Sequence, residues 1–383
     1  MTSPVCYNAP VWGADKAPDE GAIVAGKLRI AIAGTGFGER YAAGLKANPE
    51  VEVVAVFSRR AERAAAMAEE FGIPSYTRDF EDLLRIPYLE AVAVVTPNST
   101  HAEFVSRAIS AHKHVICDKP LALSGEEAGQ LYRAAEAAGV RHVTFVPYRF
   151  SPAAVAMKEA VAAGHAGRTI SVSASWGVDM REEPLRWRFQ RKLSGAGVVA
   201  DLGAHVFDLL IWWAGPIRRV LGRCKTLVTE RPLEAGGRMR PVDVPDECWA
   251  LIEFAGAGIG SVKLSWNARR DQQIEIEGDR GRLTYESPSL LQWLEGKGPF
   301  NPTARLALAG ASRPTDLPGR GKDFATPEAA LGRMFGEMVS YLRGGEKPEC
   351  VATFREGAEV MRVIDAVEES NATGRWVELA PTA

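Results

Sequence analysis

Residues 28–57 restrict the fold more than any other part of the chain, because they read as strand, glycine turn, helix and strand. A buried apolar run at 28–33 (LRIAIA) leads directly into 34–38 (GTGFG), and a second strand follows at 51–57. In such a unit Gly34 permits a tight turn, and Gly36 lets backbone amides approach a pyrophosphate at the positive end of the helix. The pattern predicts a dinucleotide-binding βαβ unit.

One position departs from the usual glycine fingerprint. Glu39 stands where a third glycine or an alanine is typical. A glutamate in the first turn suits the helix dipole but would repel a diphosphate lying close to it. We therefore expect Glu39 to turn outward and Gly38 to provide close packing.

The second strand ends in a sequence that bears on cofactor choice. NAD-specific sites place an acid there for the ribose hydroxyls, whereas this chain has Ser58, Arg59 and Arg60. A hydroxyl and two guanidinium groups suit a 2′-phosphate, since arginine forms charge-assisted bonds to phosphate oxygens. The sequence favours NADP over NAD; the alternative is that both arginines only begin the next helix in solvent.

Alternation of strands and helices continues to residue 146. Helices are expected at 61–71, 101–111 and 125–138, and strands at 89–95, 115–117 and 142–146. This order predicts a parallel, doubly wound sheet, whose ligands bind beyond the carboxyl ends of the strands. The loops 96–98, 118–120 and 147–149 all fall at that edge. The expected cofactor-binding residues are Gly34, Thr35, Gly36, Phe37, Gly38, Ser58, Arg59, Arg60, Thr96, Pro97, Asn98, His101, Asp118 and Lys119.

Lys119 follows the strand that ends at Cys117 and lies between an acid and a proline. Pro120 biases Lys119 toward extended geometry, so its ammonium can point into a cleft. An isolated Asp-Lys-Pro is more typical of a surface loop. The neighbouring loops favour a role in chemistry.

After residue 150 the pattern changes to short alternating runs at 170–176, 249–254, 259–266, 272–277 and 281–285, which predict an antiparallel sheet. A helix that ends at Gly215-Pro216 carries Asp201, His205, Asp208 and Trp212 on one face. A histidine suits proton acceptance near neutral pH, and a carboxylate one turn away can orient it and favour its charged form. The alternative is a buried structural pair.

Composition fits an enzyme of two domains. The chain has 383 residues, 46% of them hydrophobic, and a net charge of −2 that offers no basic field for nucleic acid. Five scattered cysteines form no zinc-like pairs, and the His112-Lys113-His114 run has no third ligand nearby, so no metal site is expected. We expect a flexible arm at 1–26, a Rossmann domain at 27–149 and an α+β domain at 150–383. With neither a targeting segment nor a membrane span, a cytoplasmic location is expected.

Three separated motifs together resemble the Gfo/Idh/MocA oxidoreductases, relatives of glucose-fructose oxidoreductase and inositol dehydrogenase. These are Gly34-Thr35-Gly36-Phe37-Gly38, Asp118-Lys119-Pro120 in place of the usual Glu-Lys-Pro, and Asp201-x-Gly-x-His205. The resemblance covers roughly residues 27 to 375. It implies a Rossmann domain followed by a domain with an open antiparallel sheet, whose exposed face commonly forms dimers or tetramers. It also implies that Lys119, Asp201 and His205 correspond to the catalytic residues.

The expected reaction is hydride transfer between nicotinamide and a secondary alcohol or ketone carbon of a sugar, sugar derivative or cyclitol. In the oxidative direction His205 takes the proton, Asp201 orients the imidazole or the substrate, and Lys119 stabilises the alkoxide. The expected substrate-binding residues are Lys119, Arg149, Trp176, Trp187, Asp201 and His205, with Arg181, Arg188, Trp266 and Asn267 as further contacts.

Two other classes of function stay open. An NAD-assisted glycosidase or epimerase would oxidise its substrate transiently with no net redox change, and would hold its cofactor tightly. A non-catalytic dinucleotide-binding regulator would have lost the lysine or the histidine, and here both are present.

Overall fold

The computed structural model describes residues 12–13, 26–234, 236–256, 258–268, 271–288, 290, 302–311, 313–317 and 326–380. Its first sheet has seven strands in the order β1-β4-β3-β2-β5-β6-β7. Their bounds are β1 (Trp12–Gly13), β2 (Leu28–Ala33), β3 (Val51–Phe57), β4 (Tyr76–Thr77), β5 (Ala91–Val94), β6 (His114–Asp118) and β7 (His142–Phe145). All pairings from β4 to β7 are parallel, which confirms the predicted doubly wound sheet. Strands β3 and β5 lie on opposite sides of β2, so the strand order reverses at this point. Ligands of such sheets bind beyond the carboxyl ends of the strands at the reversal, so the crevice is expected beyond β2.

The N-terminal segment contributes one strand that the sequence does not predict. Residues 12 and 13 pair antiparallel with β4, so this part of the expected flexible arm is a paired edge strand. Residues 1–11 and 14–25 of that arm lie outside the described residues.

Helices connect the strands of this sheet. They are α1 (Gly38–Lys46), α2 (Ala61–Phe71), α3 (Phe80–Leu84), α4 (His101–Ser110) and α5 (Gly125–Ala138). Local chemistry sets their ends: the Ser124 side chain caps α5 by accepting from the Glu127 amide, and Gly139 closes it with a left-handed φ of 64°. Among the residues with coordinates, no single helix is long and apolar enough to cross a membrane; one pair bent by 43°, Arg191–Asp201 with Gly203–Ala214, reaches that length and composition jointly.

The second sheet has nine strands in the order β17-β16-β15-β14-β8-β13-β12-β9-β18. Their bounds are β8 (Thr169–Gly177), β9 (Ile217–Lys225), β12 (Glu247–Phe254), β13 (Ile259–Ser265), β14 (Asp271–Gly278), β15 (Gly281–Glu286), β16 (Thr303–Leu308), β17 (Thr315–Asp316) and β18 (Val377–Glu378). The expectation of a purely antiparallel sheet is wrong at one place, because β13 runs parallel to β8. No hairpin joins these two strands, so no turn fixes their relative direction. A separate hairpin is formed by β10 (Glu230–Pro232) and β11 (Met239–Pro241).

One face of the nine-stranded sheet is covered by helices and the other is open. Helices α6 (Pro152–Ala162), α9 (Gly203–Ala214) and α12 (Phe354–Thr373) pack against it. The opposite face exposes Trp249 by 55% and Leu251 by 42%. Side chains alternate between the two faces along β12, so Cys248, Ala250 and Ile252 are buried on the helix-covered face while Trp249 and Leu251 are exposed on the other.

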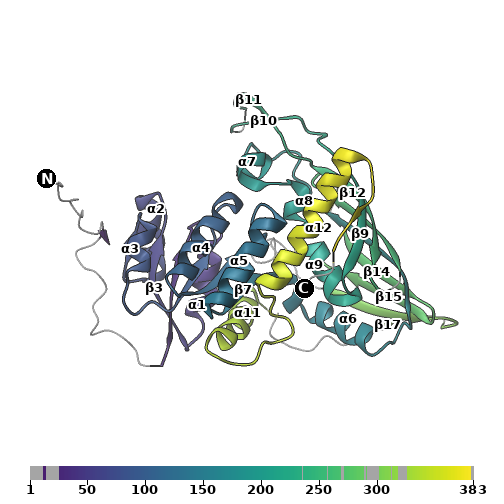
Figure 1. Ribbon diagram of the computed structural model, residues 1–383, viewed down its shortest axis with the longest axis horizontal. Coiled ribbons are helices and arrows are strands. Elements are labelled where there is room, and N and C mark those ends of the chain that lie inside the picture. The colour runs from purple at the N-terminus through teal and green to yellow at the C-terminus, as the bar shows by residue number, and fades with distance from the viewer. Residues whose placement is uncertain are drawn as a thin grey trace.

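The C-terminal helices return to the first half of the chain. Helix α12 packs against both α5 and β9, and α11 (Pro327–Leu342) packs against α1 (Figure 1). At that crossing a Cβ on Gly44 would lie 2.3 Å from the Phe335 ring, so the helices approach closely only because position 44 is glycine. Helices from the region predicted as the second domain therefore cover the first. The boundary between 149 and 150 stays a prediction.

Candidate active site

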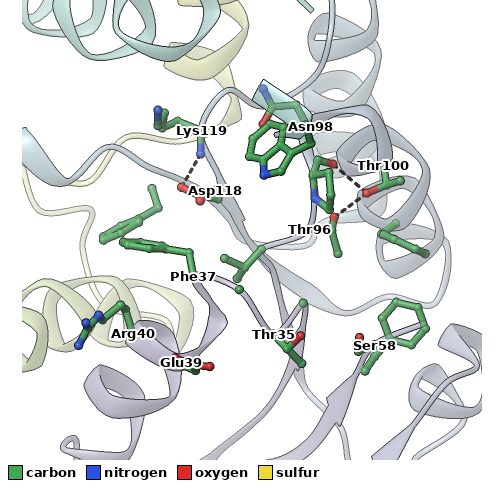
Figure 2. A pocket seen from close by; sticks show the side chains of 18 of the residues that line it. Thr35, Phe37, Glu39, Arg40, Ser58, Thr96, Asn98, Thr100, Asp118 and Lys119 are labelled. Carbon is green, nitrogen blue, oxygen red and sulfur yellow. Dashed lines mark hydrogen bonds between the residues drawn. The ribbon is translucent and has the colours of Figure 1, made fainter. Parts of the chain in front are cut away.

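A cleft of about 690 Å³ lies beyond the carboxyl ends of β2, β3, β5 and β6. Figure 2 shows side chains from these loops converging on it. The lining residues include Gly34, Thr35, Gly36, Phe37, Ser58, Arg59, Arg60, Thr96, Pro97, Asn98, Asp118, Lys119, Trp187, Asp201 and His205, all singled out from the sequence. The tertiary structure therefore brings both halves of the chain to one cavity.

The glycine turn forms one wall of the cleft. Gly34 has a φ of 117°, and a Cβ there would lie 2.3 Å from the Val95 carbonyl oxygen, so only glycine fits between β2 and β5. Gly36 has open space around it, and α1 begins at Phe37 without a side-chain cap. Free amides at a helix N-terminus suit a phosphate. Gly38 packs close to Ile32 and Met67, as expected, but it lies outside the lining and so does not contact the cofactor as predicted.

Arginines gather where β3 ends. Besides Arg59 and Arg60, the lining contains Arg63 from the first turn of α2 and, away from this end, Arg40 from α1; the sequence analysis missed both. Arg63 lies in the first turn of α2, so its closeness to the Ser58-Arg59-Arg60 run in sequence was the signal that could have identified it. Glu39 is exposed and also lines the cleft, from the first turn of α1.

The loop after β5 is tied to its neighbours. Thr100 Oγ1 lies 2.8 Å from Thr96 Oγ1, and the Asn98 amide donates to the Ser194 carbonyl at 3.1 Å (Figure 2). The ring nitrogens of His101 lie 2.8 Å from the carbonyls of Thr96 and Pro120. His101 is buried and outside the lining, so it braces two loops rather than contacting a cofactor as predicted.

Lys119 and Asp201 form an ion pair across the cleft. The Lys119 ammonium donates to Asp201 Oδ1 at 2.8 Å and to the Asp201 carbonyl at 3.0 Å. The backbone amide of Lys119 donates to the carboxylate of the preceding residue, Asp118, at 2.8 Å. Burial raises the pKa of Asp201, but the Lys119 and Arg188 charges outweigh it and the pKa lies below its usual range. Asp201 is therefore ionised.

His205 also lines the cleft, from a different helix than predicted. The expected single helix is broken into α8 (Val198–Asp201) and α9, so Asp201 ends one helix and His205 lies in the next; the short helix α7 (Arg191–Ser194) precedes both. His205 is 2% exposed, and neither ring nitrogen has a hydrogen-bond partner among the described residues. Burial, aided by the Lys119 charge, holds the pKa of His205 well below its usual value. The imidazole is neutral and can accept a proton.

Of the two predicted roles of Asp201, orientation of the imidazole is wrong, because neither ring nitrogen of His205 has a hydrogen-bond partner among the described residues; orientation of the substrate stays a prediction. Both carboxylate oxygens of Asp201 are engaged elsewhere: Oδ1 accepts from Lys119, and Oδ2 accepts from Trp266 Nε1 at 3.2 Å. The ring edge of Tyr148 instead contacts His205, with centroids 4.9 Å apart. Asp201 thus positions the lysine rather than the histidine.

Trp266, which donates to Asp201, belongs to a cluster of stacked side chains. Its ring meets Phe189 edge to face at 5.3 Å, and the Arg231 guanidinium lies 3.9 Å above the Phe189 ring. Arg231 is 1% exposed and donates to the carbonyls of Met180 and Glu183 at 2.6 and 2.7 Å. It therefore fixes the segment 180–189, which carries Trp187 into the cleft. Sequence analysis missed Arg231, because its partners are backbone atoms distant in the chain.

Five of the expected substrate contacts do not line the cleft: Arg181, Trp266, Asn267, Arg149 and Trp176. Arg149 is 2% exposed and forms a bidentate pair with Asp208 at 2.8 and 2.7 Å. Trp176 is 1% exposed and packs between Tyr148 and Tyr285. Neither lines the cleft, because inward-facing positions of β8 and of the turn after β7 belong to the core.

Comparisons with known proteins agree with this geometry. Residues 28–145 match the profile of an oxidoreductase family with an NAD-binding Rossmann fold, and residues 154–284 match the GFO/IDH/MocA C-terminal domain. The chain is 32% identical to levoglucosan dehydrogenase of Pseudarthrobacter phenanthrenivorans over 83% of this chain and 87% of that one. It is 30% identical to D-xylose 1-dehydrogenase (NADP(+)) 2 of Haloferax volcanii over 86% and 93%. A structure of levoglucosan dehydrogenase in complex with NADH matches with a TM-score of 0.80 at 27% identity, over 93% of this chain and 100% of that one.

Proposed function

The chain belongs to the Gfo/Idh/MocA oxidoreductase family, and from that premise we propose that it transfers a hydride between NADP and a secondary alcohol or ketone carbon of a sugar or cyclitol. The observation that carries the proposal is the Lys119–Asp201 ion pair beside a neutral His205, in the same cleft as the glycine turn. A cation and a proton acceptor beside a cofactor site are what alcohol oxidation needs.

The cleft fits a dinucleotide. Gly34 and Gly36 keep its wall free of side chains, and the uncapped start of α1 offers amides to a pyrophosphate. The nicotinamide end would be bordered by Thr96, Pro97 and Asn98. These residues follow β5, which is the neighbour of β6, the strand that leads to Lys119. When bound, the nicotinamide ring supplies the hydride acceptor or donor.

The protein's own residues manage the proton and the charge. His205 accepts the hydroxyl proton in the oxidative direction, because its ring is neutral and its nitrogens have no other partner among the residues described. Lys119 stabilises the developing alkoxide. Asp201 holds the Lys119 ammonium in place in the cleft through their hydrogen bond. A positioned general base contributes roughly 10²–10⁴-fold in rate.

Preference for NADP rests on the arginines at the end of β3. Arg59, Arg60 and Arg63 follow β3 and line the cleft together with Ser58. Such a set neutralises a 2′-phosphate. The exposed Glu39 lines the cleft from the first turn of α1 and not from the end of β3, where NAD-specific sites carry their acid.

Assembly and location complete the proposal. The open sheet face exposes the large apolar side chains of Trp249, Leu251 and Ile259 on adjacent strands, and a cluster of exposed apolar side chains is typical of an interaction surface. We propose a homodimer or homotetramer through this face. A cytoplasmic location is supported by the free thiols of Cys117, Cys224, Cys248 and Cys350.

The test is a turnover screen. Purified protein is mixed with NADP⁺ or NAD⁺ and a panel of sugars, sugar acids, inositols and aminocyclitols, and reduced nicotinamide is followed by absorbance. We expect turnover of at least one member, abolished in Lys119→Ala. Bound cofactor that survives purification, with no net reduction on any substrate, would instead favour a transient-oxidation enzyme.

A further inference from the structure

Arg188 lies at the chemical end of the cleft with its donors unused. Its side chain is 36% exposed, and its guanidinium lies 4.8 Å over the Trp187 ring. Its nearest carboxylate is Asp201, with Nε 3.9 Å from Oδ1, which is too far for a hydrogen bond. Arg188 donates no hydrogen bond to any residue in the described part of the chain.

Asp201 is an ion-pair partner of Arg188 at 3.9 Å but accepts no hydrogen bond from it. One of its oxygens accepts from Lys119 and the other from Trp266, so its acceptor positions facing these groups are taken. Lys119 is likewise paired with this carboxylate. Of the two cations that line this end of the cleft, Arg188 is therefore the one without a hydrogen-bonded counterion.

We propose that the substrate carries a carboxylate on the same ring unit as the reacting alcohol, and that Arg188 binds it. This inference rests on the proposed function, because it names the substrate class of that same site. Lys119 and Arg188 both approach Asp201 Oδ1, so a substrate whose alcohol meets Lys119 has its neighbouring substituents beside Arg188. A sugar acid or carboxylated cyclitol fits this spacing.

Desolvation favours the acid over a neutral sugar. A bound substrate covers the exposed part of Arg188 and removes solvent from its donors, which the Asp201 carboxylate at 3.9 Å does not reach; a substrate carboxylate accepts hydrogen bonds from these donors, whereas a neutral sugar offers only weaker acceptors. The planar fork of an arginine matches a carboxylate in a bidentate manner. A phosphate carries a second negative charge, for which this end of the cleft has no further unpaired cation among its lining residues. Neither relative compared above is named for an acid, so the proposal depends on Arg188 alone.

The experiment compares matched substrates and matched variants. Wild type, Arg188→Leu and Arg186→Leu are assayed with pairs that differ only at one carbon, such as D-glucose with D-glucuronate and D-galactose with D-galacturonate, and with the corresponding sugar 6-phosphates. Arg186 is the control, because it is 58% exposed, pairs with Glu183 and does not line the cleft. Binding of each sugar to the protein saturated with reduced cofactor is measured by calorimetry in parallel.

We expect the acid of at least one pair to have a kcat/KM at least about tenfold above that of its neutral partner. Arg188→Leu should lower kcat/KM for the acid by about tenfold or more, mainly through KM, and change the neutral sugar by less than about threefold. Arg186→Leu should behave as wild type.

Different results separate the two proposals. Turnover of neutral sugars or phosphates in preference to acids overturns the role of Arg188 and leaves the proposed function standing. Equal losses for acid and neutral substrates in Arg188→Leu also overturn it. Binding of an acid that depends on Arg188, without any turnover, supports the inference and overturns the proposed function.

Discussion

The Lys119 ammonium donates to the carboxylate and to the backbone carbonyl of Asp201, at 2.8 and 3.0 Å. Lys119 follows the carboxyl end of β6, and Asp201 is the last residue of α8, so this contact joins the dinucleotide-binding half to the second half of the chain. The pair is only 11% and 18% exposed, where charge–charge attraction is stronger than in water. The contact that joins the two halves of the chain therefore also fixes the position of the Lys119 ammonium, which is proposed to stabilise the alkoxide.

Removing the proposed catalytic groups should affect turnover more than cofactor binding. Lys119→Ala and His205→Ala are each expected to lower kcat by about 10²-fold or more, because each removes a charge or a proton acceptor from the reacting centre. The dissociation constant of the dinucleotide, titrated by fluorescence, should change by less than about threefold. Near-wild-type kcat at saturating substrate in either variant would falsify the role of that residue.

Cofactor preference should follow the residues at the end of β3. The double variant Ser58→Asp, Arg59→Ala removes one guanidinium and adds a carboxylate beside the expected 2′-phosphate. Loss of one charge-assisted contact costs about 1.5–3 kcal/mol, so selectivity should move from NADP toward NAD by at least about tenfold. The measurement is kcat/KM with both cofactors, with Arg85→Ala as a control, since Arg85 is 60% exposed and lies outside the cleft. A wild type that already prefers NAD contradicts the prediction.

Arg231 should influence the substrate without touching it. In Arg231→Met the carbonyls of Met180 and Glu183 lose their donor, so the segment that carries Trp187 and Arg188 loosens. We expect the substrate KM to rise by about tenfold while the KM for the cofactor changes little. Arg240→Met is the control, because Arg240 is the exposed cross-strand partner of Arg231. A parallel rise of both constants would show general destabilisation instead.

The start of α12 should make stability depend on pH. Burial raises the pKa of Glu356, but hydrogen bonds from Thr353 and the Lys347 charge lower it to about 2 overall. Because the folded pKa is depressed, the ionised group stabilises the protein above its unfolded pKa, and this contribution is lost as the pH falls toward about 2. Glu356→Gln should therefore destabilise at neutral pH by about 1–2 kcal/mol, with a difference that shrinks in acid.

Thermal unfolding of both proteins across this pH range checks that prediction. Glu359→Gln is the matched control, since burial raises the pKa of Glu359 and its neutral replacement should cause no such loss at neutral pH. A destabilisation by Glu356→Gln that is the same in acid as at neutral pH would rule out the ionised carboxylate as its cause.

The open sheet face should control assembly. Trp249→Glu with Leu251→Glu places two charges on the proposed interface, where charges are depleted, so a smaller species is expected in light scattering. Leu233→Glu serves as the control, because Leu233 is 51% exposed but lies beside the β10–β11 hairpin. A wild type that is monomeric at micromolar concentration contradicts the proposal.

Local sequence determined much of the first half. The apolar run at 28–33, the glycines at 34 and 36 and the alternation to residue 146 predict the parallel sheet and its cofactor edge, because strand period, turn geometry and loop position depend on neighbouring residues. The same reasoning placed Lys119, Asp201 and His205 among the site residues, and all three line the cleft.

Only the tertiary structure decided which partner each charged group takes. Helical spacing placed Asp201 beside His205, but the chain breaks that helix, and Lys119, 82 residues away, takes the carboxylate. Arg149 is buried in an ion pair with Asp208, and Arg231 donates to backbone carbonyls some 50 residues earlier in the chain. The physical reason is that a buried charge must be paired wherever a partner lies in space, and distance along the chain carries no information about that.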